Sequence, residues 1–186
     1  MTIVLCLFAA QGIFGAFDTL YYHEWRARLP DGGATTRPEL RLHAARDFIY
    51  AIIFGSLPWV EWRGAWCLVL GALLSAEIII TLRDFVVEDV VRKSLGGVYP
   101  GERVTHALMG IIYGAALAYL LPILLDWWAA PTSLAARQGA IPQWLRWALT
   151  LMSAGVFLSG VRDLCASCEL PHAAWPWRAT PAEARR

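Results

Sequence analysis

Several long apolar runs are the feature of this sequence that most restricts its fold. Within the hydrocarbon region of a bilayer a backbone must satisfy its own hydrogen bonds, so such runs form helices. With 58% hydrophobic residues and a high tryptophan content, the 186-residue chain is predicted to be an all-α integral membrane protein. Five runs approach the ~20 residues that a spanning helix needs, over residues 2–20, 44–60, 64–83, 106–127 and 144–164.

The first run is interpreted as a span and not as a signal peptide. No basic segment precedes it, and it carries Asp18, which belongs to the repeat described below. Residues 1–170 are predicted to form a single membrane domain. The segment 171–186 is rich in Pro, Ala and Arg and is predicted to be a poorly ordered cytoplasmic tail.

Basic residues divide unequally between the two ends of the predicted spans. Only Arg63, Arg137 and Arg146 fall at one end, and the remainder of the 16 Lys and Arg residues fall at the other. Cytoplasmic segments carry an excess of Lys and Arg. The amino terminus is therefore predicted to lie outside and the carboxyl terminus in the cytoplasm, in a bacterial-type inner (plasma) membrane.

The chain contains two similar copies of a two-helix unit, in which ELRLHAARDFIYA corresponds to ERVTHALMGIIYG. The preceding segments correspond more weakly. We therefore expect repeat one at 2–62 and repeat two at 64–128, forming a four-helix bundle with 144–164 as a fifth transmembrane helix. Both copies contain an even number of spans, so their polar ends should meet at one membrane face. The matched polar positions are Glu39 with Glu102, His43 with His106, Tyr50 with Tyr113, Gln11 with Glu77, and Asp18 with Asp84.

Carboxylates and imidazoles recur at helical spacing near the cytoplasmic ends of the spans. Each Glu–His pair is separated by four residues, which places both side chains on one helix face. Ionisable groups are costly near lipid and indicate function. The predicted metal ligands are Asp18, His23, Glu39, His43, Asp84, Glu88, Glu102 and His106.

This pattern resembles the ferritin-like di-metal carboxylate bundles, which combine inward Glu residues with a Glu–His pair on each of two helices. The resemblance covers only the ligand positions, and the Glu–His spacing here is four instead of three. Carboxylate and imidazole ligands suit iron, manganese or zinc. Two divalent ions, preferably iron, are predicted because they would neutralise the converging acids. Arg46 and Arg83 are the expected cationic competitors.

Three deeper polar residues are predicted to take part in catalysis. Tyr50 and Tyr113 each lie two turns beyond a histidine, ~10 Å deeper along the helix, and Glu77 lies near the middle of its span. They could carry protons or electrons to a buried substrate. The alternatives are that both tyrosines are ordinary core aromatics and that Glu77 is a partner of Gln11.

The favoured function is a di-metal oxidoreductase or hydroxylase at the cytoplasmic face. Its substrate would be a lipid, a quinone or another apolar molecule in a pocket between spans two and four. Membrane lipids and an electron-donor protein are the other expected partners, and the net charge of +1 gives no argument for nucleic acid. Alternative functions are divalent-cation binding or transport, haem ligation by His43 and His106, and a structural role based on buried salt bridges.

The cysteines give no further site. Cys165 and Cys168, followed by His172, supply only half of a zinc site, and no second cysteine pair completes it. They are interpreted as reduced thiols beside the cytoplasm.

Overall fold

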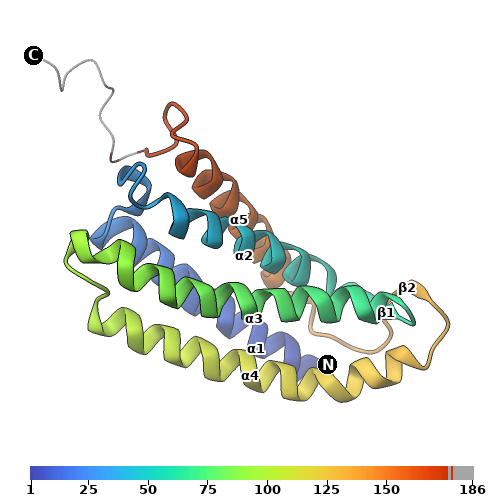
Figure 1. The fold of residues 1–186 in the computed structure, drawn as a ribbon. Coiled ribbons are helices and arrows are strands. Elements are labelled where there is room, and N and C mark those ends of the chain that lie inside the picture. Colours follow the sequence, from blue (N-terminus) through green and yellow to red (C-terminus); the bar gives the residue numbers. More distant parts are fainter. Residues whose placement is uncertain (176, 178–186) are drawn as a thin grey trace, which may run out of the picture.

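The computed structural model describes residues 1–175 and 177, which are largely helical (Figure 1). Helix α1 continues directly into a π-helix, η1 (Asp18–Arg26). Short 3-10 turns, η2 (Leu29–Asp31) and η3 (Arg92–Leu95), precede α2 and follow α3. Most of the predicted tail lies outside the described residues. The five long helices are α1 (Thr2–Phe17), α2 (Arg37–Ser56), α3 (Trp66–Val91), α4 (Pro100–Trp128) and α5 (Gln143–Ser167).

Four helical segments are long and apolar enough to cross a membrane: Thr2–Arg26, Trp66–Leu95, Pro100–Trp128 and Gln143–Ser167. The predicted all-α membrane class is therefore confirmed. The span expected over residues 44–60 is not among these four. The corresponding helix, α2, begins earlier with a charged first half and already ends at Ser56. Within its charged half Glu39 and His43 are buried, whereas Arg41 is exposed.

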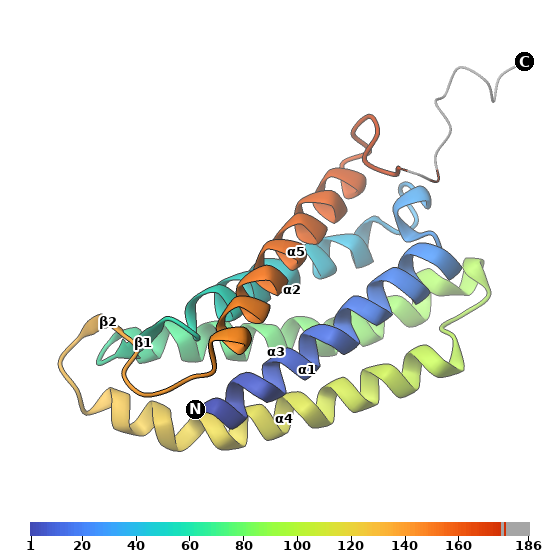
Figure 2. The ribbon, with the colours of Figure 1, turned by 180° about the vertical axis from the view of Figure 1, so that it is seen from behind.

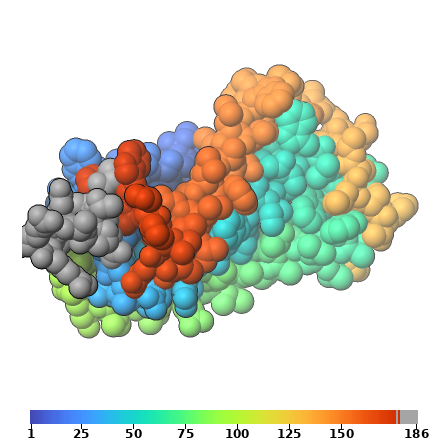
Figure 3. All heavy atoms as spheres, turned by 90° about the horizontal axis from the view of Figure 1, so that it is seen from above, coloured from blue at the N-terminus to red at the C-terminus, as the bar shows by residue number. Residues whose placement is uncertain are grey.

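Helix packing departs from the expected bundle with an outlying fifth helix. α5 makes its most extensive contacts with α2 and also touches α1 (Figures 2 and 3). α1 packs on α4 and α2 packs on α3, whereas α3 and α4 touch little. This pairing is the one that a two-fold relation between the two predicted repeats would produce. The repeat itself remains a prediction from the sequence.

The end of the molecule that contains residue 1 is closed by a small sheet. Strand β1 (Val60–Arg63) pairs antiparallel with β2 (Ser133–Ala136). Arg137 donates hydrogen bonds of 2.6 Å and 2.7 Å to the carbonyls of Leu57 and Val60. Burial lowers the pKa of Arg137 to about 10. The neighbouring core is aliphatic, with Leu70 and Leu120 fully buried.

At the opposite end, two local signals bring α3 and α4 back towards the other helices. Gly96 follows η3 with a φ of 98°, a conformation that glycine adopts without strain. α4 then starts at Pro100 with a capping box, in which a Glu102 carboxylate oxygen accepts the Tyr99 N–H at 3.3 Å. The first turn of α4 is thereby placed beside η1 and the start of α2.

Candidate metal centre

A cluster of buried ionisable side chains fills the polar end of the bundle, opposite the β1–β2 sheet in Figure 1. Four structural units supply it: η1 with the end of α1, and helices α2, α3 and α4. Seven of the eight side chains predicted as metal ligands are buried, and His106 is half-buried. The structure thus brings together Asp18, His23, Glu39, His43, Asp84, Glu88, Glu102 and His106.

The π-helix explains how Asp18 and His23 come to share a face. Residues five apart diverge around an α-helix, because its turn contains 3.6 residues. The i→i+5 pattern of a π-helix widens the turn and aligns such residues, and π-helical turns are frequent at functional sites. In η1, His23 Nε2 lies 3.2 Å from Asp18 Oδ2.

Four side chains from η1 and α4 lie close enough to share one metal ion. His23 Nε2 lies 3.2 Å from both Asp18 Oδ2 and Glu102 Oε1. His106 Nε2 lies 3.1 Å from the same Asp18 oxygen, and ligand atoms of all four lie within 4.8 Å of one another. Neighbouring ligands on an ion with bonds of ~2.1 Å stand about 3.0–3.4 Å apart, so this spacing fits a coordination shell.

Several atoms in the cluster have no aligned hydrogen-bond partner among the described residues. His23 Nε2 is one of them despite its two nearby carboxylates, and more than nine-tenths of the His23 surface is buried. His43 Nε2 and the Oδ1 atoms of Asp18 and Asp84 likewise have no aligned partner among the described residues. A buried polar atom left without a partner costs ~1–3 kcal/mol. A bound cation would satisfy the lone pairs of these atoms.

The two repeat histidines use their ring nitrogens in the same way. His43 Nε2 lies 3.2 Å from Asp84 Oδ2, just as His106 Nε2 lies 3.1 Å from Asp18 Oδ2. Each pair joins a histidine of one copy to an aspartate of the other. A carboxylate on the outer ring nitrogen of a metal-bound histidine usually orients the ring. Here His106 Nδ1 lies 3.7 Å from Glu88 Oε1.

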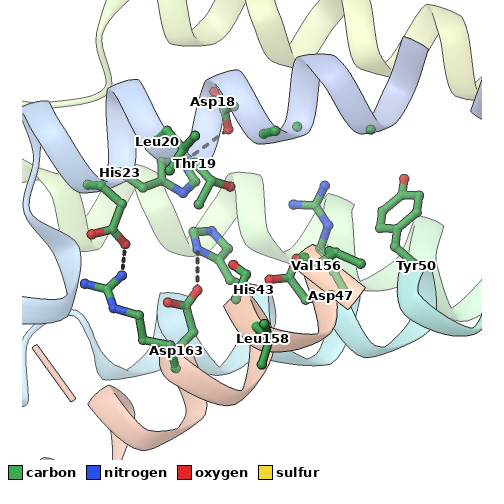
Figure 4. A pocket seen from close by; sticks show the side chains of 18 of the residues that line it. Asp18, Thr19, Leu20, His23, His43, Asp47, Tyr50, Val156, Leu158 and Asp163 are labelled. Atoms are coloured by element: carbon green, nitrogen blue, oxygen red, sulfur yellow. Dashed lines mark hydrogen bonds and ion pairs between the residues drawn. The ribbon is translucent and has the colours of Figure 1, made fainter. Parts of the chain in front are cut away.

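Asp163 lies beside His43 Nδ1 as Glu88 lies beside His106 Nδ1. It is not among the ligands predicted from the sequence. Its Oδ2 lies 3.9 Å from His43 Nδ1, and Figure 4 shows it pointing at that ring from α5. The available signal was the Arg-Asp-Leu segment ending the fifth run, which resembles the Leu-Arg-Asp of α3. That segment alone does not indicate a ligand, because no Glu–His pair accompanies it.

Two arginines neutralise part of the cluster. Arg92 is fully buried, and its guanidinium reaches Glu39 Oε1 at 2.8 Å and Glu102 Oε1 at 3.0 Å. Arg46 Nη1 donates to Asp84 Oδ2 at 3.1 Å. Arg83 was expected to compete with a metal ion for the acids. This prediction is wrong, because the Arg83 side chain is exposed. The turn of η3 directs Arg92 inward between the first turns of α2 and α4, which helical periodicity alone does not predict.

The deeper predicted residues form an asymmetric network. Tyr50 donates a 2.9 Å hydrogen bond to Glu77 Oε1 and accepts one of 3.1 Å from Gln11 Nε2. Tyr113 donates instead to the carbonyl of Leu74 at 3.1 Å. Tyr50 is therefore linked to polar side chains, while its repeat counterpart is anchored to backbone.

A cavity of about 690 Å³ adjoins the cluster between α1, α2 and α5 (Figure 4). The pocket was expected between spans two and four, whereas α4 contributes only Met109 to the lining of this cavity. Tyr50 and Tyr113 fill that interface with an edge-to-face contact, at 6.3 Å between ring centroids. Glycines along α1 and α5 leave the space open instead, among them Gly12, Gly15 and Gly155.

Comparisons with protein-family models, with curated proteins and with solved structures find no match to this chain.

Proposed function

We propose that this chain is a membrane-embedded, metal-dependent oxidoreductase. The ion is held by Asp18, His23, Glu102 and His106. The observation that supports this most strongly is the 3.1–3.2 Å spacing of these ligand atoms around a buried His23 nitrogen that lacks an aligned partner. Imidazole and carboxylate ligands suit iron, manganese or zinc. Iron is preferred because redox chemistry on apolar molecules suits a site beside lipid.

The number of ions follows from the counter-charges. The repeat predicts a second ion at His43, Asp84 and Glu39, where Arg46 already contacts Asp84 and Arg92 already contacts Glu39. The first group meets one of these cations, because Arg92 also contacts Glu102 Oε1 at 3.0 Å. A second divalent ion there would have to compete with two cations. We therefore assign one ion to the unmodified chain.

The substrate is a lipid, a quinone or another apolar molecule that enters the cavity from the bilayer, at the cytoplasmic face indicated by the basic residues. In a hydroxylation, one atom of O₂ enters a substrate C–H bond and the other leaves as water. That balance requires two protons and two electrons from a donor protein. Tyr50 and Glu77 offer a proton path, since the Tyr50 hydroxyl lies between Gln11 and Glu77. Tyr113 supports the Tyr50 ring through their edge-to-face contact.

A structural role is the second candidate, and the burial of Arg92 favours it. An arginine that bridges two fully buried glutamates can serve as an ionic core without any metal. Ion transport has less support, because the closed end of the bundle presents an aliphatic core with Leu70 and Leu120. Haem ligation has less support too. The His43 ring stacks on His23 at 4.5 Å between centroids, where a porphyrin would need the space.

The deciding experiment is elemental analysis of the purified full-length chain together with its visible absorption spectrum. We expect about one iron per chain, lost on Asp18→Ala substitution. Asp89→Ala is the matched control, because Asp89 is an acid on α3 that is exposed to solvent or lipid headgroups. A folded preparation that is metal-free, and whose stability does not respond to iron, manganese or zinc, would favour the structural candidate.

A further inference from the structure

The cavity beside the cluster has the shape of a site for an amphiphile. Along α5 it extends from Met152 to Asp163, a rise of about 16 Å. Its volume of about 690 Å³ lies in the range of small-molecule sites. One end is walled by Gly12, Phe54 and Met152, and the other by charged groups of the cluster.

Two exposed apolar side chains line the cavity. Leu20 of η1 and Leu158 of α5 are each 66% exposed, and both lie on segments long and apolar enough to cross a membrane. At the cytoplasmic end, Glu24 forms an ion pair with Arg162 and accepts a 3.2 Å hydrogen bond from the Trp177 indole. These three side chains also line the cavity and form a wall there. An occupant would therefore pass between the two leucines, directly from the bilayer.

Several hydrogen-bond acceptors line the cavity. Tyr50 donates its hydroxyl proton to Glu77, so Gln11 must present its amide N–H to Tyr50. The Gln11 carbonyl oxygen is consequently left without a partner among the described residues, on a side chain more than nine-tenths buried. Asp47 and Asp163 add carboxyl groups to the same cavity, and no arginine ion pair to either occurs among the described residues.

Donors accompany these acceptors, among them Thr19, Ser159 and Arg162. Arg46 also lines the cavity, and its Nε, which lies 3.7 Å from Glu77 Oε1, has no aligned hydrogen-bond partner among the described residues. An occupant that matches both kinds of group must donate and accept. A hydroxyl does both, whereas an ammonium only donates and a carboxylate only accepts.

From these observations we infer that the cavity binds a hydroxyl-bearing lipid, such as a quinol or a long-chain alcohol. Its hydroxyl lies between the Gln11 carbonyl oxygen and Arg46 Nε, which both adjoin the Tyr50–Glu77 pair, and its chain lies against the glycines of α1 and α5. This inference names the substrate class of the proposed function and rests on it for the chemistry. The binding itself requires no metal.

The test is photo-crosslinking in phosphatidylcholine nanodiscs, using the full-length chain and a dodecanol that carries a diazirine. Dodecanoate and dodecylamine with the same diazirine serve as matched probes. We expect the alcohol to label the α5 segment containing Met152 and Val156, about tenfold more than either ionic probe. Equal labelling by the three probes would overturn the hydroxyl assignment.

A pair of glycine variants ties the labelling to the cavity. Gly155 lines the cavity and has open space around its Cα, so Gly155→Leu should fill the cavity without a clash. Gly114 on α4 has the same open surroundings and does not line the cavity, which makes Gly114→Leu the matched control. We expect Gly155→Leu to reduce labelling by about tenfold and Gly114→Leu to leave it unchanged. Labelling insensitive to Gly155→Leu would overturn the site.

Repeating the labelling after metal chelation separates this inference from the proposed function. If the chain holds no metal but still binds the alcohol in a Gly155-dependent way, the inference stands and the metal-dependent activity fails. If the chain holds iron but the alcohol does not label α5, the metal site stands and the inference fails.

Discussion

The two halves of the cluster contain the same aspartate–histidine pair but differ in what surrounds it. We define the first half-site as Asp18 with His106, and the second as Asp84 with His43. Their Nε2–Oδ2 distances are 3.1 Å and 3.2 Å, so the pairs are geometrically alike. The first half-site adds an imidazole, His23, whereas the second adds a guanidinium, Arg46.

Each difference has a local origin. The repeat alignment matches His23 with Asp89, which is exposed because α3 stays α-helical where α1 gives way to a π-helix. It also matches Arg46 with Met109, so the first half-site lacks the corresponding arginine. Duplicated residues thus acquire different counter-charges through one change of helix register and one change of residue type. The predictions below test whether this difference decides where an ion binds.

The largest expected effect is a loss of stability when Arg92, which contacts glutamates of both repeats, is replaced. Arg92→Met leaves Glu39 and Glu102 buried without their cation. Removing one partner of a buried pair costs about 3–5 kcal/mol. Chemical unfolding in detergent should show this loss, with Arg83→Met unchanged because Arg83 is exposed. Equal sensitivity of both positions would contradict the assignment of Arg92 to the core.

The next effect separates the halves by their histidines. His23→Ala should weaken metal binding by about 100-fold, because it removes a ligand from the group with Asp18 and Glu102. His43→Ala should be milder, since His43 faces the half-site that Arg46 neutralises. Metal titration of the two purified variants compares them directly. The reverse order would move the ion to the second half-site.

Converting the second half-site towards the first should create a second ion site. Arg46→Met copies the residue at the matched position, Met109, and frees Asp84 from its 3.1 Å contact. We expect affinity for a second ion to rise by about tenfold or more, so that the ratio of metal to chain rises from one towards two. Elemental analysis measures this ratio. A ratio of two in the unmodified chain would show that Arg46 is no obstacle.

The smallest effect concerns the two tyrosines. Tyr50→Phe removes hydrogen bonds to both Gln11 and Glu77, whereas Tyr113→Phe removes one to the carbonyl of Leu74. Each net hydrogen bond contributes about 1 kcal/mol, so both variants should fold with small losses of stability. If Tyr50 lies on a proton path, only Tyr50→Phe should also slow turnover of the apolar substrate. Equal turnover in the two variants would remove that role.

Much of the fold and the candidate cluster could be predicted from residues close in the sequence. Apolar length determines the helices, because a spanning backbone must bond to itself. A spacing of four determines that Glu39 and His43 share a face, as do Glu102 and His106. The weak repeat indicated that both faces belong at the same end of the bundle, and there the structure places all eight predicted ligands.

Only the tertiary structure decided which charges meet. The contact of Arg92 with Glu39, the contact of Asp163 with His43 and the approach of Glu102 to His23 all depend on packing between elements distant in the chain. The cavity is likewise a property of α1, α2 and α5 together. Periodicity specifies which residues share a face of one helix. Which charged side chains form ion pairs, and where a cavity remains, depends on how the faces of different helices pack together. That is why the sequence determined the candidate ligands of this protein, and the assembled bundle determined which counter-charges each of them meets.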